Sequence, residues 1–207
     1  MPRPAATHQR DAEATKASIL DAAEEEFAQN GLLGARTESI AARTGVTKAM
    51  IHYYYKSKEG LYEAVLERAF LERLRALQGL ELESLPADEA LRVVIDQFID
   101  SAAEHTRLSA IFMYEAIQNK GKYYNKLGVI TLYGTIAHII ERGVKAGLFR
   151  DADPKHTAVN IVGMCIFYFC ARENVKHLWD GKPLLTKEMM AQHKQEATAM
   201  VLNGLRR

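Results

Sequence analysis

The chain has 207 residues, of which 48% are hydrophobic and 26% charged, and its formal net charge is +1. These values are typical of a globular protein with room for one small and one larger domain, and they exclude a chain that is basic throughout. Its two cysteines, Cys165 and Cys170, would point about 140° apart on a helix, so they predict no disulfide and a reducing, cytoplasmic compartment. The longest apolar run, 161–171, is too short to span a bilayer, and the N-terminus has no apolar signal segment.

The first residues, 1–14, are rich in proline, alanine and charged residues and predict a flexible arm. Apolar residues spaced by three and four then predict a helix from Thr15 to Gln29, which ends at Asn30 and Gly31. The acidic run 24–26 is expected on the solvent face of this helix.

Two short helices joined by a tight turn are predicted between residues 37 and 58. Thr37 is a good N-cap for the first helix, and Gly45 lies where that helix must end, at a position that favours a positive φ angle. Thr47 is expected to cap the second helix. This spacing is that of a helix-turn-helix, whose second helix enters the major groove of DNA and reads base edges.

The second of these helices is predicted to have an apolar inner face and a polar outer face. Ile51 and Tyr55 lie four residues apart on the inner face. The outer face carries Lys48, Ala49, His52 and Tyr53. From residue 36 to residue 58 there are five basic residues and one acid, Glu38. Charge alone also fits a solvated basic surface, but together with the spacing it indicates contact with a phosphate backbone.

The same segment resembles the DNA-binding domain of TetR-type (TetR/AcrR) transcriptional regulators. The matching residues are Thr37, Ile40–Ala41, Gly45–Val46, Thr47–Lys48, Ala49, Ile51–Tyr55 and Lys56–Glu59. The chain departs from the family pattern at His52, where tyrosine is usual, and at Met50, which replaces a commonly polar residue. The resemblance covers about the first third of the chain and implies a sequence-specific regulator of transcription that binds double-stranded DNA, usually a repressor.

The resemblance also assigns the DNA contacts, which are expected from Thr37, Thr47, Lys48, Ala49, Met50, His52, Tyr53, Tyr54 and Lys58. The two threonines would offer a hydroxyl and a backbone N–H to phosphate, and Lys48 would donate to the O6/N7 edge of guanine. Lys58 would add its charge to the start of the next helix at a phosphate. The tyrosines also fit an aromatic core: we assign Tyr55 to the core, leave Tyr54 open and expect Tyr53 to face DNA.

Helical periodicity continues to the C-terminus, and no segment predicts a strand. With the three N-terminal helices we expect about nine helices, the others being 58–79, 88–105, 108–118, 122–145, 154–179 and 186–205. The fold class is therefore all-α, with an N-terminal three-helix helix-turn-helix domain, residues 15–60, and a larger C-terminal helical bundle, residues 61–207. The helix 58–79 connects the two.

The predicted helix 154–179 is apolar around its whole circumference near its middle, so it must be covered on every side. The last helix, 186–205, carries the small residues Ala197 and Gly204, which allow close helix contact. An intrachain core and a homodimer through these two helices both fit this pattern. The resemblance implies the homodimer, whose recognition helices would lie about 34–36 Å apart on a pseudo-palindromic operator.

The resemblance further implies a small-molecule effector that binds the middle helices and releases the protein from DNA. Candidate contacts are polar and aromatic residues within apolar helix faces: Phe112, Glu115, Tyr133, His138, Phe167, Tyr168 and Arg172. Each has a structural alternative, because a buried Glu or His is often a hydrogen-bonded core group and Arg172 also fits an exposed position. Since Glu115 and Arg172 have opposite charges, the charge of the effector stays open.

Other classes of function have less support. The sequence has no phosphate-binding loop, CxxC pair, HExxH motif or nucleophile elbow, so we expect no enzyme, catalytic site, metal or cofactor. His138 and Glu141 lie three apart on a helix, but two ligands do not make a metal site. A DNA-binding protein without an effector is the remaining alternative, although the second domain is far larger than dimerisation requires.

Overall fold

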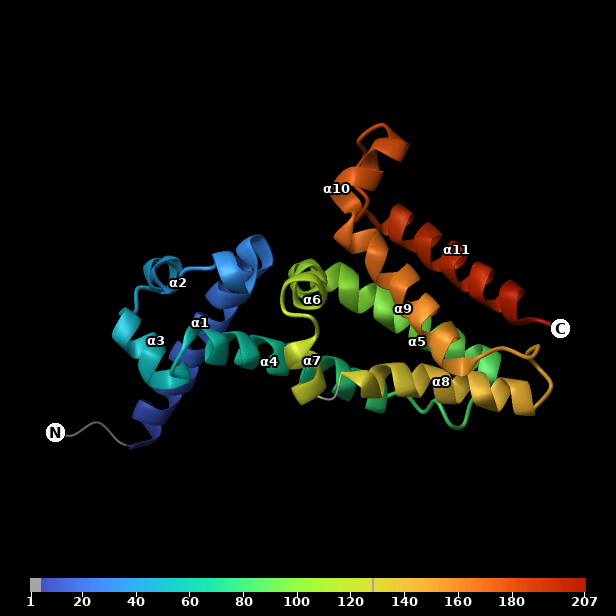
Figure 1. Ribbon diagram of the computed structural model, residues 1–207, viewed down its shortest axis with the longest axis horizontal. Coiled ribbons are helices and arrows are strands. Elements are labelled where there is room, and N and C mark those ends of the chain that lie inside the picture. The colour runs from blue at the N-terminus through green and yellow to red at the C-terminus, as the bar shows by residue number, and fades with distance from the viewer. Residues whose placement is uncertain (1–4, 128) are drawn as a thin grey trace. The chain divides into compact units, whose positions relative to one another are not determined.

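A computed structural model describes residues 5–127 and 129–207, and these residues form eleven α-helices, one short 3-10 helix and no strand (Figure 1). The all-α fold class predicted from the sequence is confirmed. In chain order the helices are α1 (Ala5–Gly34), α2 (Thr37–Thr44), α3 (Lys48–Tyr55), α4 (Lys58–Gln78), α5 (Ala87–Glu104), α6 (Thr106–Gln118), α7 (Lys122–Leu127), α8 (Ile130–Lys145), α9 (Pro154–Cys170), α10 (Arg172–Val175), η1 (Lys176–Trp179) and α11 (Lys187–Leu205). No helix in this described part of the chain is long and apolar enough to cross a membrane.

Some helix bounds differ from those predicted. α1 begins at Ala5 rather than at Thr15, because residues 5–14 include four alanines, the residue with the highest helix propensity. The expected end of this helix is present as a break at Gly31, which has φ 63° and ψ 179°. The helix expected over 122–145 is two helices, α7 and α8.

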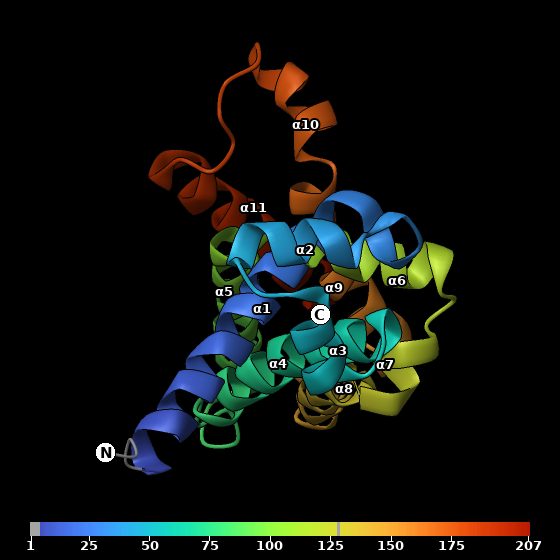
Figure 2. The same ribbon diagram turned by 90° about the vertical axis from the view of Figure 1, so that its left-hand side faces the viewer.

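The predicted helix 154–179 is also divided. α9 ends at Cys170 because Ala171, with φ −96° and ψ 5°, leaves the helical conformation. The short helices α10 and η1 follow, and both views show them projecting beyond α9 and α11 (Figures 1 and 2).

The chain divides into two compact units. The first contains the described residues up to Phe70 together with Ala110–Leu127, and the second contains Leu71–Ser109 with the residues from 129 onward. α4 and α6 therefore each contribute to both units. Their apolar periodicity runs through the points of division, so the sequence pattern does not mark them.

Buried aromatic and branched side chains form the core of the first unit. The ring of Tyr62 packs edge-on against Phe27, with centroids 5.0 Å apart, and against Tyr123, with centroids 5.3 Å apart. Ile40 of α2 and Ile51 of α3 are buried as well. Because α2 and α3 have only eight residues each, they depend on this packing for their helical structure.

The second unit is a helical bundle in which α5 contacts α8, α9 and α11, and α8 packs along α9. Its core is made of apolar residues that are almost inaccessible to solvent: Leu91, Val94, Ile95, Ile99, Ile136, Ile139, Ile140, Ile161, Val162, Cys165 and Phe169. At the surface, the Lys194 ammonium of α11 lies 2.5 Å from the Asp100 carboxylate of α5.

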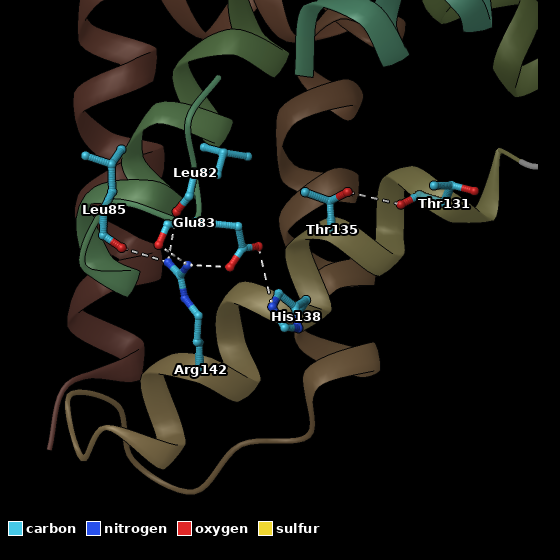
Figure 3. A network of polar contacts seen from close by, with 7 residues as sticks. All are labelled: Leu82, Glu83, Leu85, Thr131, Thr135, His138 and Arg142. Atoms are coloured by element: carbon cyan, nitrogen blue, oxygen red, sulfur yellow. Dashed lines mark hydrogen bonds and ion pairs between the residues drawn. The ribbon is translucent and has the colours of Figure 1, made fainter. Parts of the chain in front are cut away.

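An arginine fastens the loop between α4 and α5 to α8 (Figure 3). The Arg142 guanidinium donates to the carbonyl oxygens of Leu82 at 3.0 Å and Leu85 at 2.8 Å, and to the Glu83 carboxylate at 3.0 Å. The planar, forked guanidinium suits such a set of divergent acceptors. The Glu83 carboxylate also lies 3.5 Å from the His138 imidazole, so this part of α8 is committed to holding the loop.

The close packing of Gly143, near the end of α8, against Phe149 leads to a prediction about stability. A Cβ at Gly143 would overlap the buried ring of Phe149, whereas a Cβ at Gly134 of the same helix would have no described atom within 4 Å. We expect Gly143→Ala to lower the free energy of unfolding by about 1–3 kcal/mol through overpacking. Gly134→Ala is the matched control and should raise it by about 0.5–1 kcal/mol. Urea denaturation measures both, and equal effects would contradict the assigned packing.

Candidate nucleic-acid interface

The turn between α2 and α3 has the geometry expected of a helix-turn-helix. Gly45 follows α2 in the left-handed region, with φ 70°, and its N–H donates to the Ala41 carbonyl at 3.0 Å. The Thr47 hydroxyl accepts a hydrogen bond from the backbone N–H of Met50 at 3.2 Å. The predicted end of the first helix and the predicted cap of the second are both confirmed.

The start of α2 differs from the prediction. Thr37 is the first helical residue rather than the N-cap, and its hydroxyl donates to the Glu38 carboxylate at 3.4 Å. The N-cap position belongs to Arg36, whose backbone N–H donates to the Glu26 carboxylate at 3.1 Å. A side chain from α1 therefore accepts the backbone N–H of the N-cap residue itself, and no side chain caps the N–H groups of the first turn.

Glu26 is a residue whose role was not predicted, since the acidic run 24–26 was assigned to the solvent face. Glu26 is only 3% exposed. Its carboxylate accepts hydrogen bonds from the Arg36 N–H and from the Asn30 amide at 3.1 Å, and it lies 3.5 Å from the Arg43 guanidinium. A buried carboxylate requires such partners. The helical spacing carries the missed signal, because Glu26 lies three and four residues after the buried Ala23 and Ala22.

The outer face of α3 is exposed as predicted, and its inner face is buried. Lys48, Ala49, Met50, His52 and Tyr53 are all exposed, with Tyr53 at 70%. Ile51 on the inner face is 2% exposed. The residues expected to face DNA are thus on the solvent side of α3.

The other two tyrosines of the run lie partly within the first unit. The Tyr55 hydroxyl donates to the Lys16 carbonyl of α1 at 3.1 Å, and burial raises the pKa of Tyr55 to about 12. Tyr55 is thus partly buried and bonded to α1, which agrees with its assignment to the inner face of α3. Tyr54 is half-buried, and the Lys16 ammonium lies 5.7 Å from the centre of its ring.

The basic residues counted in the sequence are not equally available to DNA. The Arg43 guanidinium lies 3.4 Å from Glu25 and 3.5 Å from Glu26, so its charge is balanced by α1. The Lys58 ammonium donates to the carbonyls of Leu33 and Ala35 at 3.3 and 3.0 Å, which ties the start of α4 to the end of α1. Two of the five basic side chains therefore stabilise the unit itself.

The Lys48 ammonium forms an ion pair with the Glu38 carboxylate of α2. Both side chains are well exposed, at 63% and 66%. The residue expected to read guanine is therefore paired with an acid on the same surface.

The seven candidate effector residues are divided between the two units. Phe112 and Glu115 belong to the first unit. Glu115 is fully buried, and its carboxylate accepts from the Tyr123 backbone N–H at 2.7 Å, the Asn119 amide at 2.6 Å and the Tyr62 hydroxyl at 3.3 Å. This is the structural alternative considered above, a carboxylate that serves as a hydrogen-bonded core group.

The other five candidates belong to the second unit and are spread over it. His138 is exposed beside Glu83, and Phe167 is 61% exposed on α9. Tyr133 is half-buried on α8. The Tyr168 ring stacks on the His193 imidazole of α11 with centroids 4.0 Å apart, and burial lowers the pKa of His193.

Arg172, the last candidate, lies beside a cavity of about 310 Å³ that the loop before α11 lines with Gly181, Pro183, Leu184 and Leu185. The Tyr168 hydroxyl donates to the Leu184 carbonyl at 3.4 Å, so two of the candidates meet this loop. Within residues 5–127 and 129–207, no group of three or more His, Cys, Asp or Glu side chains is placed to hold a metal ion.

Comparison with known proteins agrees with this geometry. Residues 19–65 match the family described as bacterial regulatory proteins, tetR family, and residues 88–201 match the tetracyclin repressor-like C-terminal domain. The HTH-type transcriptional repressor NicS of Pseudomonas putida is 29% identical over 204 residues, which cover 96% of this chain and 95% of the relative.

Solved structures share the fold. A transcriptional regulator from Saccharomonospora viridis in complex with choline superimposes with a TM-score of 0.73 at 20% identity, covering 94% of this chain and 99% of the other. The regulator FadR of Bacillus subtilis in complex with stearoyl-CoA gives 0.72 at 19% identity, with 91% and 98% covered. The two family models together span both the helix-turn-helix and the C-terminal helices. The chain belongs to the TetR family of bacterial transcriptional regulators, which are DNA-binding regulators and not enzymes.

Proposed function

We propose that this regulator represses transcription by binding, as a homodimer, to a pseudo-palindromic DNA site in the bacterial cytoplasm, and that a small-molecule effector releases it. The observation that carries the proposal is the exposed outer face of α3, which a capped N-terminus and the buried Ile51 hold in place. A relative that matches along almost the whole chain is a repressor, which supports the same sense of regulation.

In this proposal α3 lies in the major groove with its N-terminal residues at the base edges. Lys48 reads guanine, Ala49 allows close approach, and Met50, His52 and Tyr53 lie along the walls of the groove. The backbone N–H groups at the starts of α2 and α3 face phosphates, as helix N-termini commonly do. Thr37, Thr47, Tyr54 and Lys58 flank these contacts.

Lys48 provides the direct test of base reading. We expect Lys48→Ala to weaken binding to a selected DNA site by about 1–3 kcal/mol and to weaken binding to a scrambled duplex less, because a base contact is lost. Lys56→Ala removes a charge from the other end of α3 and is expected to weaken both duplexes alike. Fluorescence anisotropy on sites selected from genomic fragments measures these affinities. Equal losses on both duplexes for Lys48→Ala would contradict its role as a reader.

The exposed faces of α9 and α11 support the homodimer. Val159 and Phe167, eight residues apart on one face of α9, are 56% and 61% exposed, and Met200 of α11 is 67% exposed. Ile161 and Phe169, on the other side of α9, are buried. The intrachain core considered from the sequence accounts for that buried side alone. A second copy of the chain would cover the exposed apolar side, as large exposed apolar patches commonly require.

A charge placed on this face tests the homodimer. Phe167→Glu is expected to shift the protein from dimer to monomer. Its affinity for a DNA with two half-sites should then fall at least about tenfold, because the two copies of α3 no longer bind the two half-sites together. Ile130→Glu alters an apolar side chain of α8 that is 76% exposed and serves as the matched control. Light scattering coupled to size-exclusion chromatography gives the mass. A wild-type protein that stays monomeric would contradict the proposal.

The effector proposal rests on the family and on the second unit. Relatives of the same fold bind choline and stearoyl-CoA, which supports a small organic effector without fixing its class. Among the candidate residues, Arg172 lines a cavity whose volume is near the lower end for ligand sites, and the Tyr168 hydroxyl donates to the carbonyl of Leu184, another residue of its lining. Phe112, Tyr133 and Phe167 stay candidates, whereas the Glu115 carboxylate is bonded within the core and His138 lies beside Glu83.

Thermal unfolding in the presence of metabolites tests this proposal, with choline and stearoyl-CoA as the first probes. An effector is expected to raise the unfolding midpoint with its concentration and to weaken DNA binding, because it favours the form with lower affinity for DNA. Arg172→Ala should weaken the effect, and Lys155→Ala, a change at an exposed lysine of α9, should leave it intact. A ligand that stabilises the protein but leaves DNA affinity unchanged would contradict release.

A further inference from the structure

Glu38 is the sole acid between residues 36 and 58, and it lies on the surface proposed to face DNA. It stands in the first turn of α2, its side chain is 66% exposed, and its carboxylate is paired with the Lys48 ammonium of α3. The Thr37 hydroxyl donates to its second oxygen at 3.4 Å. The hydrogen bond from Lys48 lowers the pKa of Glu38, so the carboxylate is ionised whenever the protein binds DNA near neutral pH.

A carboxylate on such a surface repels every phosphate of the DNA backbone. While Lys48 is paired with it, the two side chains together carry no net charge and add little to sequence-independent binding, which depends on the phosphates that a protein neutralises. The charge of Lys48 is therefore not free to contact an arbitrary phosphate. It becomes free only when the Glu38 contact is exchanged for another.

The exchange is unequal for a phosphate and for a base. Exposed ion pairs contribute little, so replacing the Glu38 contact by one exposed phosphate contact gains little and leaves the carboxylate unpaired. A contact with the O6/N7 edge of guanine, by contrast, discriminates that base from the others and adds to affinity at the operator only. A G·C pair also presents the cytosine N4 amino group, a donor that a carboxylate can accept from. Both members of the pair can then find partners on one base pair.

We propose that Glu38 is a specificity-determining residue, which withholds Lys48 from the phosphates of arbitrary DNA and releases it to a G·C pair of the operator. This inference rests on the proposed binding of α3 in the major groove. It adds a residue of α2 to the reading surface, and its effect is on the ratio of specific to non-specific affinity rather than on affinity alone.

The test compares Glu38→Gln with Glu59→Gln in the full-length protein. Both changes remove one exposed acid from the first unit, but only Glu38 of the two is paired with Lys48. Affinities are measured by fluorescence anisotropy over a range of salt concentrations, on a duplex selected by the wild-type protein and on a scrambled duplex of equal length. Thermal unfolding of each variant checks that the fold is retained.

We expect Glu38→Gln to tighten binding to the scrambled duplex about threefold to fivefold, and to change binding to the selected duplex less than about twofold. The salt slope on the scrambled duplex should steepen by about one, because Lys48 then makes one more phosphate contact. Glu59→Gln should shift both duplexes by the same factor. In the Lys48→Ala background, Glu38→Gln should also shift both duplexes by the same factor, because the lysine through which it acts is absent.

Two outcomes would overturn the proposed role of Glu38 and leave the proposed function of the protein intact. One is an equal shift of both duplexes by Glu38→Gln, which would make Glu38 an ordinary background charge. The other is an unequal shift that persists in the Lys48→Ala background, which would place its effect outside the pair. A wild-type protein without preference for any sequence is a separate result, since it would overturn the proposed function and this inference with it.

Discussion

A buried carboxylate of α1 fixes where α2, the first helix of the helix-turn-helix, begins. Glu26 accepts the backbone N–H of Arg36, just before α2, and lies beside the Arg43 guanidinium near the end of the same helix. Both ends of α2 are thereby tied to one side chain of α1. A buried charge of this kind is stable only while its partners stay in place, so the arrangement is all-or-none rather than gradual. The turn at Gly45 and α3 come directly after α2 in the chain, so their placement depends on how α2 is held.

Several basic side chains on the surface are likewise engaged in contacts within the protein. Arg43 and Lys58 lie in a segment that reads as basic, yet their charges are used to bind α1. Lys48 is paired with Glu38. A count of basic residues therefore overstates the attraction between this surface and a phosphate backbone. The polar groups that remain unpaired on the outer face of α3 are few. Such a surface fits recognition of particular base pairs better than a general affinity for nucleic acid.

The sequence predicted the elements that depend on local spacing. Gly45 predicted the turn and Thr47 predicted the cap of α3, because a positive φ angle and an N-cap hydrogen bond each depend on a few neighbouring residues. For Glu115 the sequence left a core role and a ligand contact both open, and the contact that ties it to α4 comes from Tyr62, which is 53 residues away in the chain. The division of α4 and α6 between the two compact units is likewise a matter of tertiary packing. Whether the named effector residues contact a ligand stays a prediction.

The brevity of α3 has an evolutionary consequence. An eight-residue helix does not persist in water by itself, so its shape is inherited from the surrounding scaffold through the buried Ile51. Its outward side chains contribute little to that shape and can be exchanged at small cost in stability. Under the proposed binding of α3 to DNA, new operator preferences are therefore accessible by substitution on one face of two helical turns, while the rest of the molecule continues to fold as before.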